Sequence, residues 1–155
     1  PVIDPEHTLA RLESGWALYR DYFVWNWRRS LRRKREAWPD VYHSLDDILE
    51  LGNLTEMTHR LACGYGGFPS LPDYLRGYAL VDQALEPLEA LRDVRVRIIA
   101  ADDDPIIPAA DLERIARPAV LTITRTRYGG HCGFYDGAAG STWVERQVLA
   151  SFDSG

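Results

Sequence analysis

The sequence predicts an α/β fold: a helical cap-like region over residues 1–80, then a segment over residues 81–155 with two parallel strands, a crossover helix and a terminal helix. In the first forty residues, apolar and aromatic side chains recur at alternating spacings of three and four, as on one face of a helix. Two short β-branched runs, at 94–101 and 119–124, occur only in the second half. The interval between them allows the crossover that parallel neighbours require.

The helical region has a clear start and several segments. Asp4 and Pro5 are typical of a helix N-terminus, because Asp caps the first turn and Pro suits its first position. The apolar spacing runs from Leu9 to Leu31, with Gly15 as a candidate break, and a basic run follows it. Three shorter helical segments are predicted at 45–49, at 54–61 and from 71 onward.

In the second half, turn signals follow each predicted strand. The first run ends in the acidic residues 102–104 before Pro105, and a helix carrying Leu112 and Ile115 comes next. The second run leads into a glycine-rich loop around His131. Ser141 is predicted to cap the terminal helix.

Composition excludes several classes of protein. The chain has 155 residues, 46% of them hydrophobic, which suits one globular domain with an ordinary core. A net charge of −5 argues against a nucleic-acid partner. Apolar runs are too short for an integral membrane segment, and two cysteines are consistent with a reducing compartment. We therefore expect a cytoplasmic protein, although the printed sequence opens without Met, so a targeting segment could precede it.

The long helical stretch carries two clusters with alternative interpretations. Its basic run is expected to be a solvated helix end favoured by the helix dipole, and the alternative is a patch for phosphate or acidic lipid. Its aromatic residues are expected to be core, and the alternative is the wall of an acyl pocket. The basic residues are Arg28, Arg29, Arg32, Arg33, Lys34 and Arg35, and the aromatic ones are Trp16, Tyr19, Tyr22, Phe23, Trp25 and Trp27.

Two residues stand where chemistry is expected in an open α/β sheet. Asp104 follows the first strand and His131 the second, and ligands of such sheets bind beyond the carboxyl ends of the strands. A proton-shuttling imidazole needs a carboxylate to orient it, and the chain order Asp then His is that of an α/β-hydrolase. Either residue alone would be an ordinary turn or surface residue. Together they predict the acid and the base of a catalytic triad.

Short motifs around these residues resemble the YheT-like α/β-hydrolases. The run 101–105 resembles the family's "A-x-D-D-P" and the run 129–134 its "G-G-H-x-G-F". Weaker likenesses lie in the opening residues 1–4 and in the helical cap, at 19–23 and at 73–74. The resemblance implies the C-terminal part of an α/β-hydrolase fold, with Asp104 as the acid and His131 as the base. It also implies a small-molecule acyl ester as the substrate, which would be hydrolysed through an acyl-enzyme. The esters in question are carboxylic esters, and lipid-derived esters are among them.

The sequence departs from the family at the nucleophile. No G-x-S-x-G pentapeptide occurs, and Ser14 and Ser70 lack the flanking glycines that a nucleophile elbow requires. We expect the nucleophile, with the N-terminal half of the fold, upstream of residue 1, and the chain alone to be inactive. No cofactor is expected, and no metal, because the acidic run lacks EF-hand spacing and His7, His43 and His59 lack zinc-ligand spacing.

Two other functions remain open from the sequence. An Asp nucleophile, as in dehalogenases and epoxide hydrolases, could replace the serine in the same framework. A non-catalytic lid or interaction module is the alternative from another class, because two strands alone leave exposed sheet edges. The residue at the missing elbow distinguishes an Asp from a Ser nucleophile. A start codon directly before Pro1 would favour the module, and an upstream reading frame with G-x-S-x-G would favour the enzyme.

Overall fold

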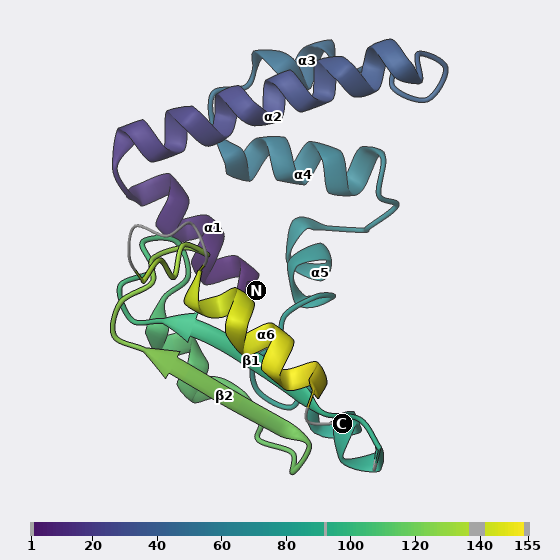
Figure 1. Ribbon diagram of the computed structural model, residues 1–155. Helices are drawn as coiled ribbons and strands as arrows, with labels where there is room; N and C mark the ends of the chain where they lie inside the picture. The colour runs from purple at the N-terminus through teal and green to yellow at the C-terminus, as the bar shows by residue number, and fades with distance from the viewer. Residues whose placement is uncertain (1, 92, 137–141, 154–155) are drawn as a thin grey trace. The chain divides into compact units, whose positions relative to one another are not determined.

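The computed structural model describes residues 2–91, 93–136 and 142–153 (Figure 1). The chain is mixed α/β: mostly helical, with two parallel strands and a C-terminal helix. It divides into two compact units, and each is considered by itself. The helical unit is Pro5–Tyr78, and the strand unit is Pro1–Asp4 with Ala79–Gly155.

The helical unit contains five helices, and the sequence predicted the break between the first two. The first two are separated at Gly15, where a Cβ would lie 2.7 Å from the carbonyl oxygen of Arg11. A residue without a Cβ is therefore required there, and the predicted break is confirmed. The helices are α1 Pro5–Ser14, α2 Ala17–Ala37, α3 Asp46–Glu50, α4 Leu54–Gly64 and α5 Leu71–Arg76.

The core of the helical unit is aliphatic and is formed by α2, α3 and α4. The guanidinium of Arg28 donates to the carbonyl oxygen of Leu51 at 2.8 Å, which ties α2 to the end of α3. Phe23 and Trp27 pack against this core, as predicted for the aromatic residues. The buried residues are Val24, Leu31, Leu45, Ile48, Leu49, Leu54 and Met57.

Four of the aromatic residues predicted to be core are exposed instead. Trp16 is 77% exposed, Tyr19 45%, Tyr22 58% and Trp25 52%. Trp16 precedes the helix, and one helix buries only a stripe against its neighbours. The core interpretation of these residues is therefore wrong.

The strand unit contains a parallel pair of strands, β1 Val96–Ala101 and β2 Leu121–Thr126, with Ile98 paired to Ile123. Its other elements are the 3-10 helices η1 Glu86–Ala90 and η2 Ala109–Arg114, and the helix α6 Trp143–Asp153.

The connection between the strands contains less helix than predicted. It holds η2, a 3-10 helix, where an α-helical crossover through Leu112 and Ile115 was expected. Ile115 is already extended and forms a parallel bridge with Asp82, and Pro118 disfavours helix just after it. The helix therefore ends within two turns.

The terminal helix α6 has a reciprocal cap. The Thr142 N–H donates to Glu145 Oε2 at 2.9 Å, and the Glu145 N–H donates to Thr142 Oγ1 at 3.3 Å. Ser141, the predicted cap, lies outside the described residues. Arg97 of β1 donates to Gln147 and Ser151, at 3.0 and 3.1 Å, so α6 lies alongside the strand pair (Figure 1).

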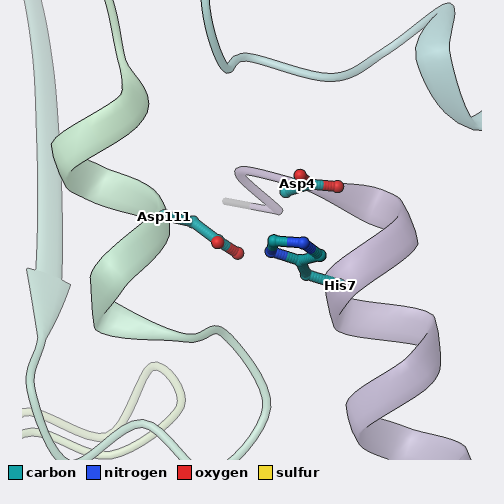
Figure 2. A group of neighbouring side chains, drawn as sticks. All are labelled: Asp4, His7 and Asp111. Carbon is teal, nitrogen blue, oxygen red and sulfur yellow. The ribbon is translucent and has the colours of Figure 1, made fainter.

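The first residues of the chain belong to the strand unit. The Leu80 N–H donates to the carbonyl oxygen of Ile3 at 2.8 Å, and Ile3 is fully buried. Asp4, 7% exposed, accepts from Arg114 at 2.6 Å, and this hydrogen bond is the main cause of a raised Arg114 pKa. Figure 2 shows Asp4 directly before α1, His7 in the first turn of α1, and Asp111, 2% exposed, on η2.

Across the described parts of the chain, none of the helices has both the length and the apolarity to cross a bilayer.

Candidate active site

Asp104 lies in the turn that follows β1 and is held by the backbone after it. Its Oδ1 accepts from the N–H groups of Ile106 and Ile107, at 2.8 and 2.9 Å. Its side chain is 11% exposed. Two backbone donors on one oxygen fix the carboxylate and leave Oδ2 for another partner.

His131 lies in a tight loop after β2, and the loop explains its glycines. A Cβ on Gly129 would lie 2.5 Å from the Phe134 ring, and Gly130 has a φ of +55°. The N–H groups of Gly133 and Phe134 both donate to the Gly129 carbonyl oxygen at 3.0 Å. Cys132, with a φ of +71°, and Phe134, with +47°, also lie in the left-handed region. This backbone is sparsely populated for residues other than glycine, and such strain often occurs at functional sites.

The two loops bring the predicted acid and base into contact. His131 Nδ1 lies 3.0 Å from Asp104 Oδ2, between residues 27 positions apart. With the carboxylate ionised, Nδ1 carries the proton and donates it, and the lone pair is then on Nε2. An imidazole oriented in this way can accept a proton at Nε2 while the carboxylate stabilises the resulting cation.

The other two aspartates of the acidic run have separate partners. Asp102 pairs with Arg125 of β2, and Asp103 Oδ1 accepts from the Gly130 N–H at 2.8 Å. Both belong to the same acidic run as Asp104. Asp104 is the member of the run that contacts His131.

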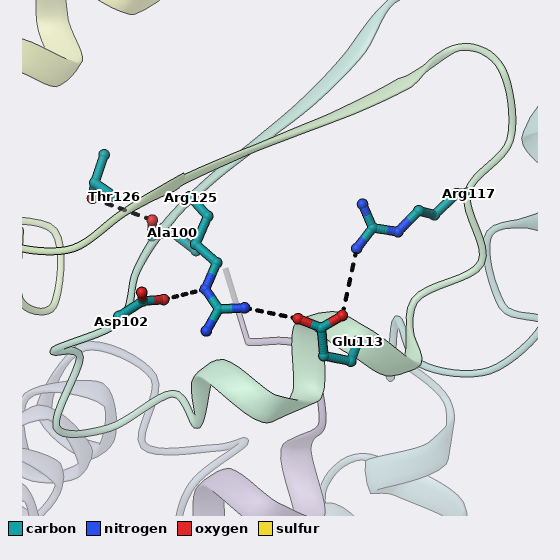
Figure 3. Close-up of polar contacts among 6 residues, drawn as sticks. All are labelled: Ala100, Asp102, Glu113, Arg117, Arg125 and Thr126. Carbon is teal, nitrogen blue, oxygen red and sulfur yellow. Dashed lines mark hydrogen bonds and ion pairs between the residues drawn. The ribbon is translucent and has the colours of Figure 1, made fainter.

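A charge network, which the sequence did not indicate, joins the acidic turn to the crossover segment (Figure 3). Arg125 contacts both Asp102 and Glu113 of η2, the latter at 2.7 Å, and Glu113 lies 4.0 Å from Arg117. The hydrogen bond that Arg125 donates to the Asp102 carboxylate is the main reason that the Arg125 pKa is raised. This network ties the turn after β1, the strand β2 and η2 together.

A small hollow opens beside the Asp104–His131 pair, and most of its lining is apolar. Mostly apolar concave sites with a few convergent polar groups are typical of small-molecule binding. The lining residues are Ile99, Ala100, Ala101, Asp104, Ile107, Pro108, Ala109, Leu112, Gly130, His131, Cys132 and Phe134.

The serines weighed as nucleophiles both serve local helix structure. Ser14 Oγ donates to the Ala10 carbonyl oxygen at 2.8 Å within α1. Ser70 is the N-cap of α5, and its Oγ donates to Asp73 Oδ2 at 2.6 Å. Neither sits on the strand-to-helix turn of a nucleophile elbow.

No family model, curated protein or solved structure matches the chain. The YheT-like resemblance therefore rests on sequence motifs alone, and the family assignment stays a prediction.

Proposed function

We propose that the chain supplies the acid and the base of a serine-type α/β-hydrolase that cleaves carboxylic esters. The observation that carries the proposal is the contact of 3.0 Å between His131 Nδ1 and Asp104 Oδ2. It joins the loops after two adjacent parallel strands, in the chain order that this class of enzyme uses.

The chemistry follows from the orientation of the imidazole. His131 removes the proton of a serine hydroxyl through Nε2, and the serine oxygen attacks the ester carbonyl carbon. His131 then returns the proton to the departing alcohol, which leaves an acyl-enzyme. His131 then deprotonates a water molecule that attacks the acyl-enzyme, and it returns this proton to the serine oxygen as the carboxylic acid is released. Throughout, Asp104 holds the imidazole and stabilises its charged form.

The small size of the sheet is an argument for a nucleophile that lies outside these residues. A two-stranded sheet is marginal by itself, and the described residues form only β1 and β2. The outer edges of both strands present backbone groups on which further strands can pair. In an α/β-hydrolase those strands carry the nucleophile elbow and the oxyanion-hole amides.

Fluorophosphonate labelling of the full-length gene product tests the proposal. We expect a labelled serine outside the 155 printed residues, in a G-x-S-x-G sequence. Labelling should slow on the order of 10⁴-fold in Asp104→Asn, which leaves the imidazole in the wrong tautomer, and at least as much in His131→Ala.

His59→Ala is the matched control, because it removes an imidazole of the helical unit. Its labelling rate should equal that of the wild type. Hydrolysis without labelling, with an acidic residue at the elbow, would point instead to an Asp nucleophile. Neither hydrolysis nor labelling would point to a non-catalytic module, and either result overturns the serine assignment.

A further inference from the structure

One face of α2 is exposed along most of its length and combines apolar with basic residues. At 3.6 residues per turn, six residues fall within a sector about 100° wide, on the side away from the buried Val24 and Leu31. Leu18 is 78% exposed, and Tyr22 and Trp25 are more than half exposed. The α2 stripe, as we name it, consists of Leu18, Tyr22, Trp25, Arg29, Arg32 and Arg33.

The charge of α2 is opposite to that of the chain. The helix carries seven basic and two acidic residues, whereas the whole chain has a net charge of −5. Other cations of α2 have partners within the unit: Arg20 pairs with Asp21, and Arg35 with Asp46.

The arginines of the α2 stripe lack such partners. Among the residues that the structure describes, no carboxylate lies within ion-pair distance of Arg29, Arg32 or Arg33. The Arg29 guanidinium lies over the Trp25 ring, 5.5 Å from its centroid. Three guanidinium groups are thus available to an anionic partner, next to exposed aromatic rings.

We propose that the α2 stripe binds the surface of an anionic lipid bilayer, with α2 parallel to the membrane plane. Leu18, Tyr22 and Trp25 reach the boundary between headgroups and acyl chains, where Trp and Tyr are enriched. The arginines contact lipid phosphates. The proposal is independent of the hydrolase function, because it uses the helical unit alone.

The chemistry and shape of the stripe favour a lipid surface over other anionic partners. Leu18 and Arg33 are fifteen positions apart, so the stripe runs about 22 Å in a straight line, which suits a plane. A solvated helix end accounts for the arginines but not for the large apolar side chains in line with them. Nucleic acid is disfavoured by the net charge of the chain.

A shallow hollow along one flank of the α2 stripe is lined by several hydrogen-bond donors. Guanidinium, hydroxyl and amide groups are among its lining, and each of these groups can donate hydrogen bonds to phosphate oxygens. Its lining residues are Phe23, Asn26, Trp27, Arg29, Ser30 and Arg33.

Vesicle flotation with the full-length gene product tests the proposal. We expect binding to phosphatidylcholine vesicles with about 30 mol% phosphatidylserine, and at least tenfold weaker binding to pure phosphatidylcholine. The triple substitution Arg29→Gln, Arg32→Gln and Arg33→Gln should weaken binding on the order of 100-fold. The double substitution Leu18→Gln and Trp25→Gln should also weaken it at least tenfold, although it leaves the charge unchanged. Gln is a good helix former, and circular dichroism verifies that each variant is folded.

A second triple substitution controls for total charge. Arg60→Gln, Arg76→Gln and Arg127→Gln remove the same charge from residues that do not belong to the α2 stripe, and binding should change less than threefold. Equal binding to both kinds of vesicle, equal loss in the two triple variants, or no binding at all overturns the proposal. Retention on immobilised polyglutamate without vesicle binding would indicate an acidic protein partner and also overturns it.

Discussion

The Gly130 N–H donates to the Asp103 carboxylate at 2.8 Å, and Gly130 is the residue directly before His131. Asp103 and Asp104 therefore hold the same loop at two adjacent points, one through the backbone and one through the imidazole. This double attachment fixes where the imidazole lies relative to the end of β1.

The first prediction is that Asp103→Ala loosens the His131 loop. Removing the acceptor leaves the Gly130 N–H unpaired, and a hydrogen bond to a charged group contributes about 1.5 to 3 kcal/mol. Exchange protection of the Gly130 amide, measured by NMR, should fall at least tenfold. Asp103→Asn keeps a carbonyl acceptor and should retain most of the protection. Unchanged protection in Asp103→Ala would show that the carboxylate does not hold the loop.

The second prediction concerns the tautomer of His131. In the wild type the Asp104 carboxylate should hold the proton on Nδ1, and in Asp104→Asn the proton should move to Nε2 in most molecules. Nitrogen-15 NMR distinguishes the two tautomers directly. His7, His43 and His59 serve as internal references, because their spectra should not change. An Nε2-protonated His131 in the wild type contradicts the prediction.

The third prediction is that the Arg125 network makes stability depend on salt. Arg125→Met keeps the aliphatic stem but removes the pairs with Asp102 and Glu113. The urea midpoint should fall at low salt, and the difference from wild type should shrink in about 1 M NaCl, where the Debye length is about 3 Å. Arg127→Met, two positions further along the chain, should have a smaller effect. An equal difference at both salt concentrations would mean that packing, not charge, explains it.

The fourth prediction is a loss of stability of the helical unit in acid. Hydrogen bonds from Ser70 and then from Arg76 lower the pKa of Asp73, against an opposing effect of desolvation. The ionised form is therefore favoured in the folded unit. Its contribution is fully present above the ordinary Asp pKa of 3.8 and is lost as the pH falls through the lowered value.

Acid unfolding of Asp73→Asn, followed by circular dichroism, measures this contribution. The variant should be less stable than wild type near neutral pH, and the difference should narrow as the pH falls below 3.8. Ser70→Ala removes the largest cause of the shift and should give an intermediate result. A difference that stays constant from neutral to acid pH would rule out the linkage.

The candidate site could be predicted from the sequence only where local signals coincide. Asp104 and His131 each follow a β-branched run, and their order and spacing suffice to bring them together. The role of Asp103 left no such signal, because its partner is a backbone N–H that every residue except proline possesses. The pairing of Arg125 with Asp102 depends on strand register, which a sequence with two candidate strands does not define.

In the fold, too, local signals predicted some features, and features that depend on tertiary packing could not be predicted. Gly15 and the apolar spacing predicted the boundary between α1 and α2. Periodicity could not tell which aromatic residues face the core, because α2 carries large apolar side chains on two sides. The helix content of the crossover was overestimated, since a short amphipathic run fits a 3-10 helix as well as an α-helix.

The hydrogen bond between Leu80 and Ile3 makes the helical unit an insertion whose two ends meet. A segment that leaves and re-enters a domain at one point can be exchanged, lengthened or excised without breaking the path of the chain around it. A change in the length of residues 5–78 therefore leaves the path of the chain through the strands and loops that position Asp104 and His131 unaltered.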